Sequence, residues 1–532
     1  MAETAKKRAR TEAAPLPAGK PKVFNDAVLG HVELHPCCVA IVDSPEFQRL
    51  RGLKQLGPTE YVYPAAGHTR FAHSLGVSFL AGKLVEKLAA QTSPPLHITP
   101  REILCVKLAG LCHDLGHGPL SHTFEKFVRM QRPSIRWHHE HASAALFKKV
   151  VTDHQLLQGV FGTYALDESD VHFVQELIFG DESDAPETWA WKGLPATKRF
   201  LFEIVSNHRN GIDVDKFDYF RRDAFHLNIP VSFDSDRLIM AARAIPDDTG
   251  VFTVTYPEKE VWNVYELFRT RFNLHKRAYQ HRVVHAVERM LCDVLMEAEA
   301  GGFTLHGIKL SKAMENLETY ATLTDAVFDV IAFLATTDLK LKPAALLLER
   351  IRTRQLHRHV GEVVVPPLKR DDVCARNEED LLREIARHAP DPAGRQALLA
   401  GAYAHRFDIT FGMGDRNPVE RVFFYLRGDD AVGRILNASQ VSTFVPRHFA
   451  ESYVRLFVRD RDDAGLYDAA LSALQAWERA VLGRTESAIA PSPTRGVPKA
   501  KRPPRPPPHA RPVGYRGDGL QGERAPGPPR TP

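Results

Sequence analysis

The feature that most constrains the fold is a helical spacing of apolar residues that recurs through most of the chain. Apolar side chains follow one another at intervals of three or four positions in residues 75–90, 101–113, 140–151, 171–179, 199–208, 260–300 and 311–335. Such spacing places the apolar side chains on one face of an α-helix. Runs typical of strands come later, at residues 407–411, 422–426 and 453–458. We therefore expect a mainly α protein, in which a helical bundle precedes a smaller α/β region.

The two ends of the chain differ in composition from the part between them. Residues 1–21 are basic and rich in Ala and Pro, and residues 485–532 contain 13 prolines in 48 residues. Such segments cannot bury enough apolar surface to build a core, so both ends are expected to be disordered. Of the net charge of +5, the two ends carry +3 and +6, which leaves −4 on the rest. An anion site in the body of the chain therefore needs a local basic cluster.

Two short motifs near the ends of the chain concern the regulation and the cellular location of the protein. The basic cluster of residues 6–10, Lys-Lys-Arg-Ala-Arg, is typical of a nuclear localisation signal, although a solvated charge run has the same composition. Residues 492–495, Ser-Pro-Thr-Arg, fit a proline-directed kinase site at Ser492, a match short enough to arise by chance. No apolar run of about 18 residues and no signal-peptide core is present, so we expect no membrane span. The nucleus, with or without the cytoplasm, is the expected location.

The six cysteines bear on the redox environment. They include the adjacent pair Cys37 and Cys38, and they show neither a disulfide framework nor a zinc-finger spacing. A reducing, intracellular compartment is therefore expected.

The chemistry is concentrated in residues 112–122, which read Cys-His-Asp-Leu-Gly-His-Gly-Pro-Leu-Ser-His. Neutral imidazole and carboxylate are suitable ligands for a divalent metal. The glycines and the proline break the preceding helix, so the backbone and the later histidines can approach an anion closely. A single His-Asp pair is commonly structural, whereas three histidines and an aspartate in one turn indicate a metal-centred hydrolase.

Two further segments supply similar side chains. Residues 68–74 offer a second imidazole and a guanidinium, and residues 210–223 offer another carboxylate beside a lysine. In chain order, these segments and the turn give the His…His-Asp…Asp signature, through which the sequence resembles the HD hydrolase superfamily. The resemblance implies an HD-domain helical bundle that holds one catalytic divalent metal, Zn, Fe or Mn. The implied ligands are His73, His113, Asp114 and Asp215.

Several other motifs make the resemblance closer. Residues 22–26 (Lys-Val-Phe-Asn-Asp), 47–51 (Phe-Gln-Arg-Leu-Arg), 54–57 (Lys-Gln-Leu-Gly) and 273–281 recur in the right order. From about Lys22 to about Leu482 the chain resembles the vertebrate SAM- and HD-domain deoxynucleoside triphosphate triphosphohydrolases. The resemblance implies an HD core at 22–310 with its motifs at 70–220, a regulatory and oligomerisation region at 311–484, and the tail at 485–532. It also implies attack of a metal-activated water on the α-phosphorus, which releases a deoxynucleoside and inorganic triphosphate.

The resemblance also implies roles for individual residues in the catalytic site. His139 would be the general acid, oriented by Glu140, and His117 and His122 would contact the α-phosphate. The substrate would be bound by Gln55, Leu56, Arg70, Lys216, Tyr219, Asp223, Arg271, Tyr279 and Gln280. Among these, the basic residues would hold the triphosphate, Gln55 and Asp223 would read the 3′-hydroxyl, and the tyrosines would exclude a 2′-hydroxyl. Taken alone, Tyr279 could be an ordinary core aromatic and Arg70 a solvated charge.

A second set of residues is implied to bind activators, GTP or dGTP and a dNTP, together with additional Mg. The guanine site would use Lys22, Val23, Asn25, Asp43, Gln48 and Arg51, with Arg354 and Arg358 from a neighbouring chain. The deoxynucleotide site would use Val62, Phe71, Arg237, Lys259, Asn263, His281, Arg282 and Arg416. Nucleotides that bridge subunits would stabilise a homotetramer, so activation would accompany assembly. The implied role is control of cellular dNTP pools, which would also restrict viral DNA synthesis.

The chain departs from the family at several places. Only 21 residues precede Lys22, so we expect no SAM domain. Pro257 stands where the family has an arginine, and Arg358 and Arg282 replace lysines, which changes hydrogen-bond geometry. Residues 370–406 match poorly. The alternative hypotheses are a single-stranded nucleic-acid-binding protein that uses its basic ends, and a general HD phosphohydrolase or nuclease.

Overall fold

The computed structural model of the chain describes residues 20–436, apart from Ser93, 181–195 and Arg427, and then Ser442, residues 444–483 and Ile489. Contacts divide the chain into residues 1–491 and 492–532, and every described residue belongs to the first unit. The basic cluster at 6–10, Ser492 and nearly all of the two ends expected to be disordered lie outside the described residues.

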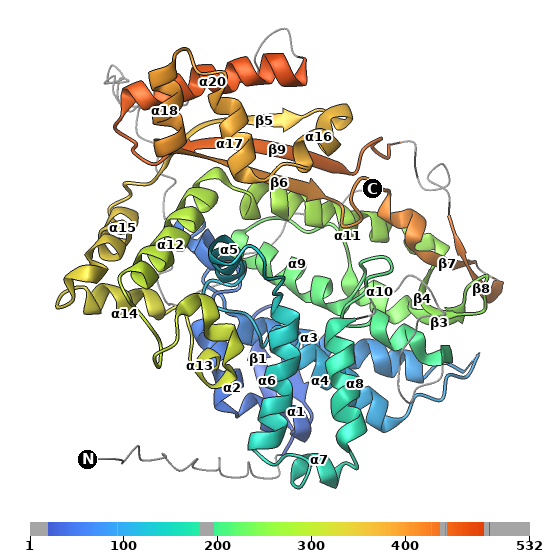
Figure 1. Ribbon diagram of the computed structural model, residues 1–532. Helices are drawn as coiled ribbons and strands as arrows, with labels where there is room; N and C mark the ends of the chain where they lie inside the picture. The colour runs from blue at the N-terminus through green and yellow to red at the C-terminus, as the bar shows by residue number, and fades with distance from the viewer. Residues whose placement is uncertain are drawn as a thin grey trace, which may run out of the picture. The chain divides into compact units, whose positions relative to one another are not determined.

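A bundle of helices forms the centre of the described structure (Figure 1). Its main members are α3 (Arg70–Ala89), α4 (Pro100–Cys112), α6 (His139–Asp153), α8 (Glu168–Phe179) and α9 (Val214–Leu227). Helix α3 packs against α4 and α9, and α8 packs against α4 and α6. The start of α4 is fixed by a capping box of Thr99 and Glu102, and the start of α9 by the side chain of Asp213. The prediction of a mainly helical fold is confirmed.

The long periodic stretches are less regular than their spacing suggested. Residues 260–300 form α11 (Val261–Leu274), a π-helical turn (His275–Tyr279) and α12 (Arg282–Ala300). Residues 311–335 form a 3₁₀ turn (Leu310–Glu315), α13 (Leu317–Tyr320) and α14 (Val327–Leu334). The helix expected at 199–208 is wrong in type, because a 3₁₀ helix covers Ala196–Glu203 and turns follow it. A π-turn commonly marks a functional site, and this one faces the cavity described below.

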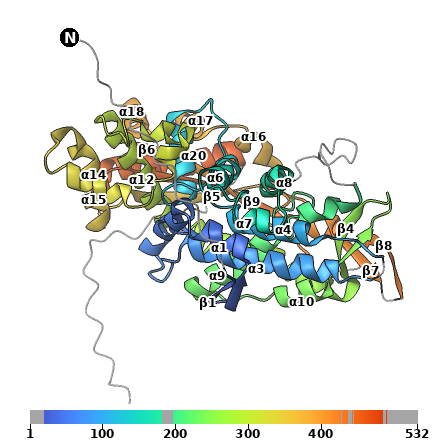
Figure 2. The same cartoon turned by 90° about the horizontal axis from the view of Figure 1, so that it is seen from below.

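Strands form three small sheets. The hairpin of β1 (Lys22–Asp26) and β2 (Gly30–Leu34) lies against α3 and α9 (Figure 2). A second sheet has the order β3 (Arg243–Pro246), β4 (Phe252–Pro257), β7 (Phe423–Leu426) and β8 (Asp429–Ile435). The third has the order β5 (Arg358–Val365), β9 (Ala450–Val458) and β6 (Ala402–Thr410). The three predicted strand runs fall in β6, β7 and β9, whereas the other strands were not predicted.

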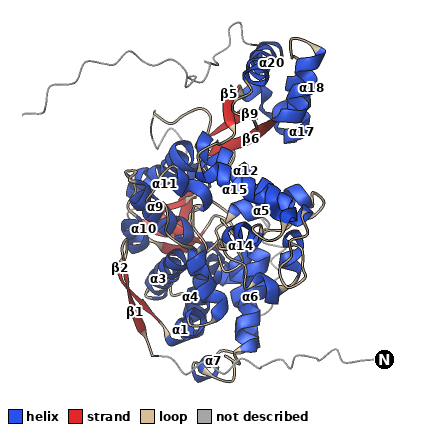
Figure 3. Cartoon of the chain, turned by 90° about the vertical axis from the view of Figure 1, so that its left-hand side faces the viewer, coloured by secondary structure: helices blue, strands red, loops and turns tan. Residues whose placement is uncertain are grey.

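The remaining elements are short or lie towards the C-terminus. Three helices accompany the third sheet: α17 (Glu378–Ala386), α18 (Pro392–Gly401) and α20 (Ala464–Leu482) (Figure 3). The other helices are α1 (Pro36–Val42), α2 (Pro45–Gln48), α5 (His122–Gln131), α7 (Val160–Thr163), α10 (Ser235–Ala241), α15 (Lys342–Arg352) and α16 (Arg370–Cys374). Further 3₁₀ turns cover Arg49–Gly52, Gly57–Tyr61, Glu258–Glu260, Leu339–Leu341, Pro367–Lys369 and Pro418–Arg421.

Two apolar cores organise these elements. The first runs through the helical bundle, continues past residue 310 to Ile351 and also includes residues between Phe411 and Phe449. The second lies between the third sheet and its helices, with Trp477 fully buried within it. None of the described helices is both long and apolar enough to cross a membrane. The six cysteines are all free, as their spacing predicted.

Candidate functional site

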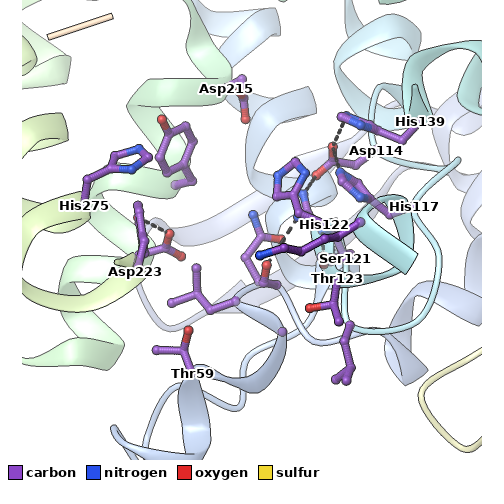
Figure 4. Close-up of a pocket in the computed structure, with 18 of the residues that line it drawn as sticks. Thr59, Asp114, His117, Ser121, His122, Thr123, His139, Asp215, Asp223 and His275 are labelled. Atoms are coloured by element: carbon purple, nitrogen blue, oxygen red, sulfur yellow. Dashed lines mark hydrogen bonds and ion pairs between the residues drawn. The ribbon is translucent and has the colours of Figure 1, made fainter. Parts of the chain in front are cut away.

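A cavity of about 600 Å³ opens in the helical bundle. Its wall is built from the start of α3, the turn after α4, the starts of α5, α6 and α9, and the π-turn between α11 and α12 (Figure 4). Almost all of the side chains expected in the catalytic site line this cavity. They are Gln55, Leu56, Arg70, His113, Asp114, His117, His122, His139, Glu140, Asp215, Lys216, Tyr219, Asp223, Arg271, Tyr279 and Gln280. The fold therefore brings together residues that are up to 225 positions apart.

The four expected metal ligands lie together at one end of the cavity. His73 is fully buried beneath the lining, with its Nε2 atom 3.1 Å from Asp215 Oδ1 and 3.3 Å from Asp114 Oδ2. The ring of His113 lies 5.1 Å from that of His73, and its Nε2 atom is 3.5 Å from Asp215 Oδ1. His73, His113 and Asp114 offer donor atoms within 4.8 Å of one another.

The unsatisfied nitrogen atoms of this group indicate a metal site. The Nδ1 atoms are occupied, because His113 donates to the carbonyl of Gly110 at 2.9 Å and His73 donates to Asp218 at 2.8 Å. The Nε2 atoms of both rings are buried and have no hydrogen-bond partner. Two imidazole lone pairs and two carboxylates directed at one point fit a divalent cation, which is the donor set that the sequence predicted.

Electrostatics keep the two carboxylates of this group ionised. Burial acts to raise the pKa of Asp114, but Arg70, His113 and His117 outweigh it and hold that pKa well below its usual range. Burial also acts to raise the pKa of Asp215, but the adjacent imidazoles of His113 and His73 outweigh it and hold that pKa below its usual value. Both carboxylates are therefore anionic near neutral pH and able to bind a cation.

A second group of histidines lies beside the first. The rings of His117 and His139 stack with centroids 3.7 Å apart, and His139 Nδ1 donates to Glu125 Oε1 at 2.7 Å. The predicted orienting residue, Glu140, has its Oε2 atom 3.5 Å from the same nitrogen. The side chain of His122 is 68% exposed and lies 3.7 Å from Glu125.

The two stacked rings have opposite pKa shifts. Burial, together with Arg70 and His139, holds the pKa of His117 well below its usual value. Burial also acts to lower the pKa of His139, but the hydrogen bond with Glu125 and the charge of Glu140 raise it above its usual value. The shifts favour the neutral form of His117 and the cationic form of His139, which makes His139 the better proton donor of the two.

Three basic side chains line the same cavity as the histidines. Arg70 is buried, donates to Ser121 Oγ at 2.9 Å and also bonds Asp114. Lys216 bonds Asp213 at 2.8 Å, and Arg271 donates to the carbonyl of Thr410 at 2.7 Å. Because the body of the chain is net negative, these three cations form the local anion site that the charge distribution required.

Another part of the lining carries side chains suited to recognise a sugar and a base. Tyr279 donates its hydroxyl proton to Asp223 Oδ2 at 2.5 Å, and His68 donates to Asp223 Oδ1 at 2.7 Å. The Oε1 atom of Gln55 is buried without a hydrogen-bond partner. Such an unsatisfied acceptor in a cavity wall is costly unless a ligand satisfies it. Asp223, Tyr279 and Gln55 therefore form a polar wall that can receive a hydroxyl group.

The turn that carries His117 and His122 has a strained backbone, which is held by hydrogen bonds from residues far away in the sequence. Leu120 and Ser121 both have positive φ, at 55° and 58°, which is unfavourable for side-chain-bearing residues. Asp325 accepts hydrogen bonds from the backbone N–H groups of Leu120 at 2.6 Å and Lys54 at 2.9 Å. Arg49 is buried and donates to the carbonyl groups of Leu115, His117 and Leu323.

Four functional candidates in this site were not predicted from the sequence. They are Glu125, which bonds His139, Asp218, which bonds His73, and the braces Arg49 and Asp325. Asp218 could have been found, because it lies three positions after Asp215 on the same helix. Nothing local marks Asp325, because its partners are more than 200 positions away.

The expected guanine-site residues of this chain lie together on the surface. Lys22 Nζ lies 3.3 Å from Asp43 Oδ1, and Arg51 donates to Gln48 Oε1 at 2.8 Å. The guanidinium of Arg51 lies 3.5 Å from the ring centroid of Phe71. Val23 and Asn25 are exposed on β1.

Two residues expected in the deoxynucleotide site, Arg237 and Asn263, share one carboxylate partner, whereas Phe71 of that site lies beneath Arg51. Arg237 bonds Glu260, with its Nε atom at 3.0 Å, and Asn263 donates to the same carboxylate at 3.1 Å. Of the other expected activator residues, Lys259, Arg282, Arg354 and Arg416 are exposed, and Val62, His281 and Arg358 are half-buried. Arg354 donates to the carbonyl of Tyr61 at 3.2 Å, and Arg358 lies 3.6 Å over the ring of Tyr467. Pro257 is buried at the end of β4, where it pairs with Tyr425.

The fold and the His-Asp centre together define an HD-domain hydrolase, and a family model of the HD domain matches residues 70–187. The deoxynucleoside triphosphate triphosphohydrolase SAMHD1 of Bos taurus is 41% identical over 459 residues, which cover 84% of this chain and 77% of that protein. The human protein of the same name is 41% identical over 460 residues, covering 84% and 72%. A homolog from Dictyostelium discoideum is 34% identical over 441 residues, covering 83% and 78%. The chain belongs to the SAMHD1 family.

Proposed function

We propose that the chain is a metal-dependent dNTP triphosphohydrolase that releases a deoxynucleoside and inorganic triphosphate. The observation that carries the proposal is one cavity that combines the unsatisfied Nε2 atoms of His73 and His113 with the cations Arg70, Lys216 and Arg271. Membership of the SAMHD1 family supports the choice of substrate. A divalent metal held by His73, His113, Asp114 and Asp215 would supply a Lewis acid that polarises the phosphate and activates water.

The chain's own residues account for the rest of the reaction. Arg70, Lys216 and Arg271 hold the triphosphate by charge-assisted hydrogen bonds, and neutral His117 with exposed His122 can approach the α-phosphate. The raised pKa of His139 favours its protonated form, and His139 is proposed to donate this proton to the leaving 5′-oxygen.

Selection of a deoxyribose is assigned to the polar wall. Asp223 is held on both oxygen atoms by His68 and Tyr279, so its remaining lone pairs have a fixed direction. A fixed acceptor of this kind, with Gln55 beside it, can bind a 3′-hydroxyl group. Tyr219 and Tyr279 line the same cavity and are proposed to leave no room for a 2′-hydroxyl.

Activation by GTP or dGTP and a dNTP, with Mg accompanying the nucleotides, is proposed to accompany formation of a homotetramer. An apolar surface on α14, the following 3₁₀ turn and α15 supports assembly. It consists of Val330, Phe333, Leu339 and Leu346, of which Phe333 and Leu339 are 74% and 76% exposed. Contiguous exposed apolar side chains of this size are typical of a contact with another protein surface.

The assembly proposal can be tested by sedimentation. Phe333→Ser should lower the tetramer fraction that GTP and a dNTP induce, whereas Leu368→Ser, which alters a leucine that is 96% exposed elsewhere, should not. A tetramer of unchanged stability in Phe333→Ser would remove this surface from the interface.

The catalytic proposal is tested by a product assay. Purified protein with Mn²⁺ or Mg²⁺ and GTP should release inorganic triphosphate from a dNTP, and the double variant His113→Ala/Asp114→Ala should release none. Release of monophosphate, or no release at all, overturns the proposal and favours a general HD phosphohydrolase or nuclease.

The remaining predictions about partners and cellular location are proposals as well. Nuclear localisation, phosphorylation of Ser492 and single-stranded nucleic-acid binding through the basic ends rest on segments outside the described residues. Restriction of viral DNA synthesis would follow from depletion of dNTP pools. A fusion of residues 1–21 to a reporter would test the localisation signal, because exclusion of the reporter from the nucleus contradicts it.

A further inference from the structure

A row of buried ionic side chains leads from the β1–β2 hairpin to the metal ligand His73. His73 Nδ1 donates to Asp218 Oδ2 at 2.8 Å. Arg222 binds the same carboxylate through two bonds, Nε to Oδ2 and NH2 to Oδ1, each 2.8 Å long. Its third nitrogen, NH1, donates to Asp26 Oδ2, also at 2.8 Å. The four side chains therefore form one continuous hydrogen-bonded chain.

The inner half of this chain fixes the orientation of His73. Because Asp218 accepts the Nδ1 proton, the lone pair of His73 lies on Nε2, which is directed at Asp114 and Asp215. A carboxylate behind a ligating imidazole sets both the tautomer and the ring direction. Asp218 touches neither the cavity nor a substrate, so it is a positioning residue.

Because these hydrogen-bonded side chains are buried, the loss of any one of them leaves its partner without compensation. Asp218 is fully buried and Arg222 is 2% exposed, so the guanidinium depends on its two carboxylates for compensation. The neighbouring backbone leaves no spare room. A Cβ atom on Gly76 would lie 2.0 Å from Asp218 Oδ1 and 2.6 Å from Arg222 NH2. Movement of one group must therefore be transmitted to the next.

The outer half of the chain holds the hairpin. Asp26 is the last residue of β1, and its second oxygen accepts from the N–H groups of Val28 at 2.9 Å and Leu29 at 2.8 Å. The same carboxylate therefore closes the turn between β1 and β2 and anchors Arg222 (Figure 2 shows the hairpin beside α3 and α9). Strand β1 also carries Lys22, Val23 and Asn25, the residues assigned to the guanine site.

We propose that the Asp26–Arg222–Asp218 chain couples the position of the β1–β2 hairpin to the metal ligand His73, so that an activator bound at the hairpin tightens metal binding. The coupling step rests on the proposed function, because that function places the activator at the hairpin. By linkage, metal binding then tightens activator binding by the same factor. The metal would then be held more tightly in the activated state.

Metal retention tests the proposal without a substrate. Equilibrium dialysis at graded free Mn²⁺ concentrations, with Mg²⁺ constant and GTP present or absent, gives the Mn²⁺ affinity from the metal content of the protein. Asp218→Asn should weaken Mn²⁺ binding by about 10- to 100-fold, as is usual when a carboxylate behind a ligating histidine is lost. Wild-type affinity in Asp218→Asn would overturn the positioning role.

Two milder variants test the coupling. Arg222→Lys keeps the charge but cannot span both carboxylates, and Asp26→Asn frees the hairpin end of the chain. Both should retain Mn²⁺ binding without GTP better than Asp218→Asn does, and both should lose the gain in affinity that GTP causes in the wild type. A full GTP effect in Asp26→Asn, or no GTP effect in the wild type, overturns the coupling.

Matched controls lie on the adjacent helical face. Arg221 bonds Asp236 at 3.1 Å on the surface, away from His73. Arg221→Lys and Asp236→Asn are therefore the same substitutions in an ion pair that is not part of the Asp26–Arg222–Asp218 series, and both should behave as the wild type.

The outcomes also separate this proposal from the proposed function. If the wild type releases no triphosphate but GTP still tightens Mn²⁺ binding, the proposed reaction fails while the coupling stands. If Asp218→Asn does not fold, the two milder variants still decide the coupling.

Discussion

The catalytic cavity and the activator residues differ in how much of each site a single chain completes. In the cavity, side chains from six segments are already joined by hydrogen bonds (Figure 4). The buried Nε2 atoms of His73 and His113 both face Asp215. The residues proposed to bind activators are mostly exposed, with Lys22 paired to Asp43 and Arg237 paired to Glu260. The first site is preorganised, whereas the second becomes complete only with a ligand or another chain.

The physical reason for this difference is the cost of rearranging charges. A buried ionic network is held because removal of one partner leaves an uncompensated charge. An exposed ion pair is screened by water and salt, so its partners can be exchanged for a phosphate or a base at little cost. A regulatory site needs such exchange, while a catalytic site needs fixed distances. Substitutions in the buried network and in the exposed pairs test this contrast.

The largest effect is expected from Asp114. Asp114→Asn removes an anionic ligand and the partner of Arg70, while it preserves the shape of the side chain. We expect triphosphate release to fall by about 10³-fold or more, because the metal and the electrostatic stabilisation are lost together. A quantitative product assay and metal analysis of the purified variant check this. Near wild-type release with full metal content would show that the cavity is not the reaction site.

The next effect separates two carboxylates that face His139. Glu125→Gln removes the bond of 2.7 Å that raises the pKa of His139, whereas Glu140→Gln alters a contact of 3.5 Å. Because a general acid must be protonated, a lower pKa moves the alkaline decline of activity to lower pH. We expect this shift, with a loss of about 10²-fold at high pH, mainly in Glu125→Gln. A larger shift in Glu140→Gln would assign the orienting role to Glu140.

These two regions also show what a sequence can predict. The helices around the site followed from apolar spacing, and the metal chemistry of the His-Asp turn followed from its residue types. The other cavity residues were predicted only through the family resemblance. The hairpin strands β1 and β2 were missed because each has only five residues, too few for their alternation to stand out in the sequence. The π-turn at His275–Tyr279 was missed because its apolar spacing continues that of the flanking helices.

The hydrogen bonds that Asp325 and Arg49 make with distant backbone groups could not be predicted from local sequence patterns. Asp325 bonds the backbone of Leu120 and Lys54, and Arg49 bonds three carbonyl groups. A backbone hydrogen bond imposes no requirement on the partner's side chain, so the sequence carries no paired signal. Such contacts depend on the tertiary fold alone.

A moderate effect is expected from Asp325. Its carboxylate accepts from two backbone N–H groups, and an asparagine has a single acceptor oxygen, so Asp325→Asn leaves one N–H group unpaired. We expect a loss of about 1–3 kcal/mol in stability, and reduced activity because Gln55 and His122 lie next to the released backbone. Chemical denaturation and steady-state kinetics measure both quantities.

The pH dependence of this variant provides the control. Burial raises the pKa of Asp325 to about 6. A carboxyl group with a raised folded-state pKa stabilises the fold fully below its unfolded pKa, and this contribution is lost as pH rises through the folded pKa. The stability advantage of the wild type over Asp325→Asn should therefore decrease between about pH 4 and pH 7. An advantage that increases over this range contradicts the assignment.

The smallest effect on the fold, and the sharpest test of the contrast, is expected from Asp43. Asp43→Asn removes an exposed pair with Lys22, in which the two side chains are 45% and 49% exposed. The change in unfolding free energy should stay below about 1 kcal/mol, since exposed pairs contribute little. The GTP concentration for half-maximal activation should nevertheless rise by about tenfold or more, because the carboxylate that accepts from guanine is lost. Asp236→Asn, in another exposed pair, should change neither quantity. An unchanged GTP response in Asp43→Asn would mean that the exposed group around β1 is not a guanine site.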